Sequence, residues 1–222
     1  MVKAHPAVHQ ASKGKRCPTA QRPFRENRPL QWMVLWVVTL WVLTAIAPRY
    51  PRDWLLENLL VFASCGLLAL TYRRFAFSNL SYGLFTVFLS LHLVGAHYTY
   101  AEVPLGFWLQ HALGLARNHY DRIVHCAFGL LLAYPLRELL LRGGGLRRSW
   151  SYGMTVVTVA GLSCGYEVIE AIAAMLVEPQ LGVAYLGTQG DMWDAQKDSL
   201  LAIVGAAFAM LCVRFSSLKE CP

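Results

Sequence analysis

Charged side chains are scarce in this sequence. Asp, Glu, Lys and Arg make up 15% of its 222 residues, whereas hydrophobic residues make up 56%. Soluble domains carry about 25% charged residues, and the apolar residues here form long runs instead of recurring at the period of a strand or an amphipathic helix. The composition therefore excludes an ordinary soluble domain and indicates a membrane protein.

Motifs of several enzyme and metal-binding classes are also missing. The six cysteines are scattered without a C-x-x-C pair, so neither a disulfide framework nor a zinc ribbon is expected. There is no H-E-x-x-H and no G-x-x-x-x-G-K-[ST] motif. No serine or cysteine is adjacent in sequence to a His and acid pair, so a hydrolase is expected to lack its nucleophile and to depend on metal-activated water.

Six apolar runs are present, and each is long enough to cross a bilayer. They cover residues 31–47, 54–72, 79–96, 122–141, 151–175 and 195–214. A hydrocarbon core of about 30 Å requires a helix of roughly 20 residues, and only a helix satisfies the backbone within one segment. We predict an all-α fold, a polytopic membrane helix bundle of about six transmembrane helices in residues 30–215, with cytoplasmic tails at 1–29 and 216–222.

Lys and Arg are divided unequally between the two sides of this bundle. With the N-terminus inside, 15 of the 20 lie in cytoplasmic segments and five lie outside. Translocation disfavours Lys and Arg near spans, so both termini are predicted to be cytoplasmic in a bacterial inner membrane. The net charge of +7 is then an orientation signal, so the expected partner is the lipid bilayer and not nucleic acid. The oligomeric state is left open.

Acidic and histidine residues concentrate in the outer segments 96–121 and 176–194 and continue into the adjoining helices. The candidate binding residues are Asp121, Arg122, His125, Glu167, Glu170, Asp191, Asp194, Lys197 and Asp198. Spacings of three or four residues define three helix faces. They carry Asp121 with His125, Glu167 with Glu170, and Asp191 with Asp194 and Asp198. We predict that these three faces meet at the same depth and form an outward-facing acidic/His site.

Carboxylates inside a membrane need a partner, because an ionised one costs at least ~2.5–3.5 kcal/mol. The six acids outnumber their basic neighbours Arg122, Lys197 and His125. The surplus negative charge predicts a bound head group of an envelope lipid or a cation. A divalent cation is the cofactor that such a site could hold, with His125, Glu170 and Asp198 as candidate metal ligands.

Helix capping is the alternative explanation for the acids at helix starts. Side-chain oxygens of Asp121 and Asp194 would accept hydrogen bonds from free N–H groups and favour the positive end of the helix dipole. Capping does not explain Glu167 and Glu170, because they lie near the C-terminal end of their helix, where the dipole disfavours acids. This pair is therefore the strongest indication of a functional site.

Small residues form two patterns on the last predicted helices. Gly161 and Gly165 make a G-x-x-x-G step in the fifth, and Gly205, Ala206 and Ala209 make a small-residue face in the sixth. Such residues let helix backbones approach closely. We expect both patterns to be helix-packing surfaces.

Three sequence segments support a resemblance to a known family. They are NHYDRIVH running into FGLLLAYPLRE (118–125 and 128–138), YEVIE (166–170) and YLGTQGDMWDAQKD (185–198). Over about residues 30–215 the chain resembles the bacterial YjdF inner-membrane family, which implies this topology and compartment but no reaction. The order D-x-x-x-H, then an acidic pair in the next span, then D-x-x-D before the last span is more loosely similar to the pattern of the VanZ-like family. That family is linked to glycopeptide-antibiotic tolerance, and this chain has Ser199 where it usually has Asn.

Three functions are compatible with these patterns. The first is an integral inner-membrane protein that binds an envelope lipid head group or a cation at the acidic/His site. The second is a proton- or ion-coupled transporter, which needs a cavity that continues to the cytoplasm. The third is a metal-dependent membrane enzyme acting on lipid or on a cell-wall precursor. Whether the chain is an enzyme is left open by the sequence.

Overall fold

The computed structural model describes residues 23–177 and 179–216, and these residues form helices joined by short linkers. The long helices are α1 (Arg28–Thr44), α2 (Pro51–Thr71), α3 (Asn79–Tyr98), α5 (Tyr120–Arg142), α6 (Arg148–Leu176) and α8 (Asp194–Phe215). The shorter ones are η1 (Phe24–Glu26), η2 (Tyr100–Glu102), α4 (Pro104–Leu113) and α7 (Pro179–Leu186). The predicted all-α membrane bundle is confirmed, and most of each predicted tail lies outside the described residues.

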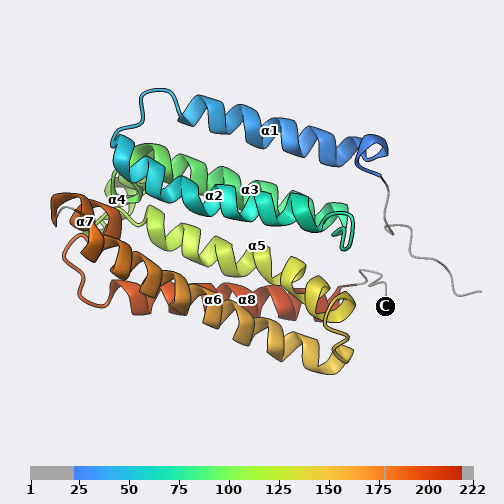
Figure 1. The fold of residues 1–222 in the computed structure, drawn as a ribbon. Helices are drawn as coiled ribbons and strands as arrows, with labels where there is room; N and C mark the ends of the chain where they lie inside the picture. The colour runs from blue at the N-terminus through green and yellow to red at the C-terminus, as the bar shows by residue number, and fades with distance from the viewer. Residues whose placement is uncertain (1–22, 178, 217–222) are drawn as a thin grey trace, which may run out of the picture.

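Five of the helices, α2, α3, α5, α6 and α8, are long and apolar enough to cross a membrane. Each begins and ends within three residues of a predicted run. Helix α1 coincides with the remaining run but has 17 residues, a length of about 26 Å at 1.5 Å per residue. It lies along α3 and runs parallel to the axis of the bundle (Figure 1).

Prolines and capping side chains set where several helices begin. Pro51 and Pro104 occupy the first turn of α2 and α4, where the missing N–H group has no partner in the helix to lose. At the start of α3 the Ser78 hydroxyl accepts a hydrogen bond from the Ser81 N–H at 3.2 Å. These local signals are visible in the sequence and, with the apolar runs, determine where the helices begin.

The two long linkers that were expected to be loops each contain a short helix. Helix α4 lies between α3 and α5, and α7 lies between α6 and α8. Gly114 ends α4 in the left-handed conformation at φ 62°, which glycine adopts without steric cost. Both short helices lie at the same end of the bundle, called here the α4/α7 end (Figure 1).

Helix α5 is central and packs on α3, α6 and α8. A Cβ atom added at Gly129 of α5 would lie 1.8 Å from the carbonyl oxygen of Ala202. One added at Gly205 of α8 would lie 2.4 Å from the carbonyl oxygen of Cys126. The backbones of α5 and α8 therefore touch, which confirms the small-residue face of α8 as a packing surface.

The same prediction is wrong for α6. A Cβ atom added at Gly161 or Gly165 would meet no atom within 4 Å, so none of the described helices packs closely there. Both glycines instead line the cavity described below. The G-x-x-x-G spacing shows that a backbone is accessible, but it does not show that another helix covers it.

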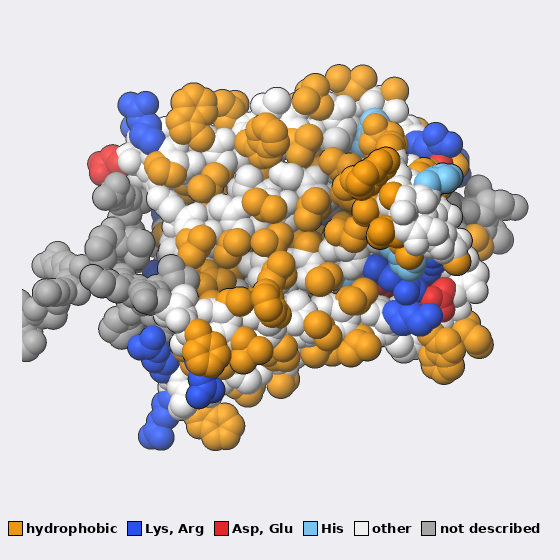
Figure 2. All heavy atoms as spheres, turned by 180° about the vertical axis from the view of Figure 1, so that it is seen from behind, with side chains coloured by type: hydrophobic (Ala, Val, Ile, Leu, Met, Phe, Trp, Pro, Cys, Tyr) orange, Lys and Arg blue, Asp and Glu red, His pale blue; other side chains and the backbone are white. Residues whose placement is uncertain are grey.

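Charged side chains gather at the two ends of the molecule, and an apolar band separates them (Figure 2). Many large hydrophobic side chains on the long helices are exposed in this band, as expected for surfaces that face lipid. The histidines visible in this view gather at the α4/α7 end (Figure 2). The polar candidates of the sequence analysis belong to this end.

Candidate functional site: an arginine clamp beside a polar cavity

Acidic side chains at the start of α8 are paired with basic ones from three segments. Arg117, in the linker before α5, donates hydrogen bonds to both carboxylate oxygens of Asp194. The Arg122 Nη2 atom lies 2.5 Å from Asp191 Oδ2 and 3.1 Å from Asp194 Oδ1. Lys197 Nζ lies 2.6 Å from Asp191 Oδ2. We call these five residues the arginine clamp.

The arginine clamp contains a cation, Arg117, that was left out when acids and bases were counted from the sequence. Arg117 is only 9% exposed and was not among the candidate residues. Its position in the sequence could have identified it, because it is one of the five Lys and Arg residues on the side where the positive-inside rule disfavours them. With Arg117 included, three cations face Asp191 and Asp194, so these two acids contribute no surplus negative charge.

Hydrogen bonds between the two linkers hold the clamp in place. Arg117 Nη1 donates to the carbonyl oxygen of Thr188 at 2.8 Å. The Gln189 side chain accepts from the N–H of Asn118 at 3.1 Å and donates to its carbonyl oxygen at 2.9 Å. The Asn118 amide in turn donates to the carbonyl oxygen of Val103 at 3.0 Å. The linkers before α5 and α8 are therefore one connected unit.

These contacts shift the pKa values of two groups that lie outside the long helices, Asp191 and His119. Hydrogen bonds from Lys197, from the N–H of Trp193 and from Arg122 hold the pKa of Asp191 well below its usual range. Burial, together with the neighbouring Arg122 and Arg117, lowers the pKa of His119. Asp191 is therefore charged and His119 neutral at pH 7, so the clamp gains no further cation from this histidine.

His125 joins the predicted faces of α5 and α6. Its Nε2 atom lies 3.5 Å from Asp121 Oδ1 and 3.4 Å from Glu167 Oε1. Asp121, Asp194 and Asp198 each bring a carboxylate oxygen within 4.8 Å of the others. Asp198 Oδ1 lies 3.9 Å from Arg122 Nε. The structure thus brings the three helix faces together, with His125 and Asp121 at the junction.

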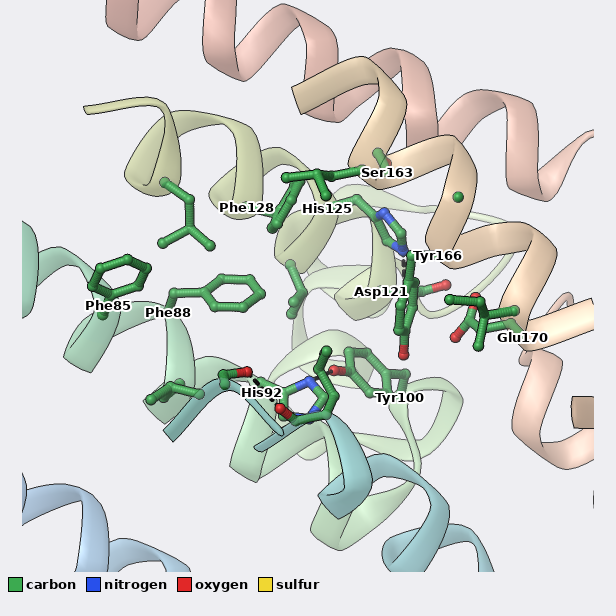
Figure 3. Close-up of a pocket in the computed structure, with 18 of the residues that line it drawn as sticks. Phe85, Phe88, His92, Tyr100, Asp121, His125, Phe128, Ser163, Tyr166 and Glu170 are labelled. Carbon is green, nitrogen blue, oxygen red and sulfur yellow. Dashed lines mark hydrogen bonds and ion pairs between the residues drawn. The ribbon is translucent and has the colours of Figure 1, made fainter. Parts of the chain in front are cut away.

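A cavity of about 360 Å³ extends from this junction into the bundle between α2, α3, α5 and α6. The polar residues that line it are Ser64, His92, Tyr100, Asp121, His125, Ser163, Tyr166 and Glu170. Its apolar lining includes Leu60, Phe85, Phe88, Phe128 and Leu132. Figure 3 shows Asp121, Tyr166 and Glu170 on one side and Phe85 and Phe88 on the other.

The cavity is polar at one end because of the direction of its helices. Along α5 it runs from Asp121, in the first turn, to Leu132, a distance of about 16 Å at 1.5 Å per residue. Along the antiparallel α6 it runs from Glu170 back to Gly161. The polar end therefore lies toward the α4/α7 end, and the apolar end lies at mid-helix depth.

One side of the cavity is open between α2 and α6. Helix α2 packs on α3 and α7, whereas α6 packs on α5, α7 and α8. Residues at the rim are exposed although they line the cavity, namely Leu60 at 37%, Leu162 at 49% and Ile169 at 62%. Gly161 and Gly165 leave space on the α6 side. The opening faces the apolar band of the bundle.

A second polar group, on α2 and α3, was missed by the sequence analysis. The Tyr100 hydroxyl lies 2.6 Å from His92 Nδ1, and His92 Nε2 lies 3.1 Å from the carbonyl oxygen of Glu57. The Tyr166 hydroxyl donates to Glu57 Oε2 at 3.4 Å. Asp53, one turn before Glu57, accepts a hydrogen bond from Thr99. The i and i+4 spacing of two buried acids at a helix start was the signal that could have found this group.

One hydrolase-like pattern, at Ser163, was missed in the search for enzyme motifs. Residues 161–165 read GLSCG, which matches the G-x-S-x-G pattern of hydrolases. Ser163 lines the cavity and is 2% exposed, but its Oγ atom has no hydrogen-bond partner among the described residues, His125 included. It lies inside α6 and not on the strand-to-helix turn that makes this pattern a nucleophile elbow.

Comparison with known proteins agrees with the membrane architecture. The family model "Predicted membrane protein (DUF2238)" matches residues 29–218. Inner membrane protein YjdF of Escherichia coli (strain K12) is 38% identical over 178 residues, which cover 80% of this chain and 85% of that protein. No solved structure matches the chain. The chain therefore belongs to the YjdF-like family of predicted membrane proteins and is a multi-pass protein of the inner membrane.

Proposed function

We propose that the protein binds an envelope lipid in the cavity, with the lipid head group at the acidic/His end. The observation that carries this proposal is the cavity itself, which is polar near the α4/α7 end and apolar at mid-helix depth. Such a division matches an amphipathic molecule, because the apolar lining excludes water while a few polar groups fix the orientation of the ligand. The opening between α2 and α6 gives a path from the bilayer.

The proposed site faces away from the cytoplasm. Short loops retain Lys and Arg on the cytoplasmic side, and those assigned to that side by sequence, such as Arg73, Arg74, Arg147 and Arg148, belong to the end opposite α4 and α7. The α4/α7 end is then the outer end, and the ligand is a lipid of the outer leaflet. Envelope lipids are the amphipathic molecules available there.

The test fills the opening of the cavity without disturbing the fold. In Gly165→Leu the new side chain meets no atom within 4 Å of its Cβ and enters the cavity. The matched control is Gly153→Leu, on the same helix, where a Cβ also meets nothing and no cavity residue is replaced. Lipid retained after purification in mild detergent is measured by native mass spectrometry.

We expect wild type and Gly153→Leu to retain bound lipid and Gly165→Leu to lose it, with all three equally helical by circular dichroism. Equal retention by wild type and Gly165→Leu would overturn the proposal. Retention of no lipid by folded wild-type protein would overturn it as well.

A further inference from the structure

The head-group end of the cavity has two carboxyl groups in its lining. They belong to Asp121 on α5 and Glu170 on α6, and no Lys or Arg is among the described residues that line the cavity. We propose that the lipid bound there carries a primary ammonium group, which lies between Asp121 and Glu170. This inference rests on the proposed function and names the class of lipid that the same cavity selects.

The histidines at the cavity do not supply the missing charge. A neutral His92 ring satisfies both of its contacts, because Nε2–H donates to the Glu57 carbonyl oxygen and Nδ1 accepts from the Tyr100 hydroxyl. His125, if charged, would already face two acids, Asp121 and Glu167. At least one carboxylate at the cavity is then left for a positive ligand.

Buried acids behind the lining increase the demand for a cation. Glu57 is 2% exposed and is held by the Tyr166 hydroxyl and the His92 ring. Asp53 lies one turn away and is 1% exposed. Ionised carboxylates that are removed from water repel one another strongly, because charge interactions are stronger where water is excluded, and a positive group between them stabilises the ionised forms.

Aromatic rings at the polar end add to the recognition of an ammonium group. Tyr100 and Tyr166 line the cavity together with the two acids, and aromatic rings attract ammonium groups through their negative faces. Farther along α6, toward the apolar end, Ser163 lines the cavity with an Oγ atom that is buried and has no hydrogen-bond partner among the described residues. That atom can donate a hydrogen bond to an oxygen of the lipid.

A bare metal ion fits this end of the cavity less well than an ammonium group. Within the described residues, the group of three carboxylates close enough to share an ion is Asp121, Asp194 and Asp198, and Glu170 is not part of it. Both oxygens of Asp194 are already bound by Arg117, and Arg122 contacts it too. Asp194 is therefore already neutralised by guanidinium groups and is not free to bind such an ion.

The experiment compares two head groups on the full-length protein. Nanodiscs contain equal amounts of phosphatidylethanolamine and phosphatidylglycerol with identical acyl chains, and native mass spectrometry measures which lipid the protein retains. The variants are Glu170→Gln and the double variant Asp121→Asn/Glu170→Gln. The matched control is Glu102→Gln, which makes the same change at the same end of the bundle, where the acid pairs with Arg49 outside the cavity.

We expect wild type and Glu102→Gln to enrich phosphatidylethanolamine by about tenfold, which corresponds to ~1.4 kcal/mol. The double variant should retain both lipids equally, and Glu170→Gln should lie between. Circular dichroism confirms that each variant is folded.

Each other outcome has a definite meaning. If wild type retains both lipids equally and Gly165→Leu loses both, the ammonium inference is overturned while the lipid-binding proposal stands. If the double variant keeps the preference, the inference is also overturned. If wild type retains neither lipid, or if Gly165→Leu retains as much as wild type, both proposals fail.

Discussion

The arginine clamp and the cavity lie within a few residues of each other, yet their carboxylates have opposite surroundings. In the clamp, Asp191 and Asp194 face guanidinium and ammonium groups at hydrogen-bond distance. In the cavity, Asp121 and Glu170 share the lining with histidine and tyrosine, and no Lys or Arg is among the described residues that line it. Acids of the first kind hold the linkers in place, and acids of the second kind are the ones that the proposed function assigns to a ligand.

This difference shows why a count of acids along predicted helices cannot by itself locate a site. Asp121 and Asp194 look alike in sequence, since both lie in the first turn of a long helix. Their roles separate only because Arg117 reaches Asp194 from a linker 77 residues earlier in the chain. Substitutions can test whether the clamp is structural, whether the open side of the cavity is free of packing and whether Asp191 stabilises the protein through its charge.

The largest effect is expected for Arg117→Ala. The change leaves Asp194, which is 5% exposed, without its main partner, and breaking a buried pair on one side costs about 3–5 kcal/mol. Chemical unfolding of the purified protein in detergent measures the loss. The matched control is Arg49→Ala at the same end, where the arginine side chain is 59% exposed and removal should cost less than ~1 kcal/mol. Equal losses would show that the clamp is not structural.

The next effect contrasts two glycines on neighbouring helices. In Gly129→Ala the new methyl group would overlap the backbone of α8, so the free energy of unfolding should fall by about 1–3 kcal/mol. In Gly161→Ala the methyl group enters open space, and the higher helix propensity of alanine should leave stability unchanged or raise it by up to ~1 kcal/mol. Thermal unfolding of both variants gives the comparison. A loss for Gly161→Ala as large as that for Gly129→Ala would contradict the open side of the cavity.

The smallest effect is expected for Asp191→Asn in the arginine clamp. The pKa of Asp191 is lowered in the folded state, so its contribution to stability is present above the usual aspartate pKa of about 4. That contribution is lost as pH falls toward the lowered value. Asp191→Asn should therefore melt slightly below wild type at pH 7, and the difference should shrink in strong acid. A difference that stays constant between pH 7 and pH 2 would rule out this ionic origin.

The helices, and the residues that share one helix face, could be predicted from the sequence. Apolar runs predicted, to within three residues, the five helices that are long and apolar enough to cross a membrane, because hydrocarbon leaves the backbone no alternative to a helix. The pairing of Asp121 with His125 and the position of Glu167 beside them follow from local spacing plus one helix contact. The role of these residues as a binding site stays a prediction.

Residues that act through tertiary contacts were not predicted. Arg117 lies in a linker, and its partner is identified only by the fold. Glu57 and His92 meet across two helices, so neither the acid nor the histidine shows its partner in its own segment. The step from Gly161 to Gly165 was assigned to packing because spacing alone does not reveal whether a neighbouring helix is present.

The open side of the cavity also has a kinetic consequence. In the proposed lipid-binding role, the occupant would exchange with the bilayer on this side, where rim residues of α2 and α6 are exposed and α6 has glycines at two positions. Its residence time is then set by how strongly the occupant is held, as in most complexes where dissociation controls affinity. The protein would act as an equilibrium binder of membrane lipid, whose occupancy follows the local lipid composition.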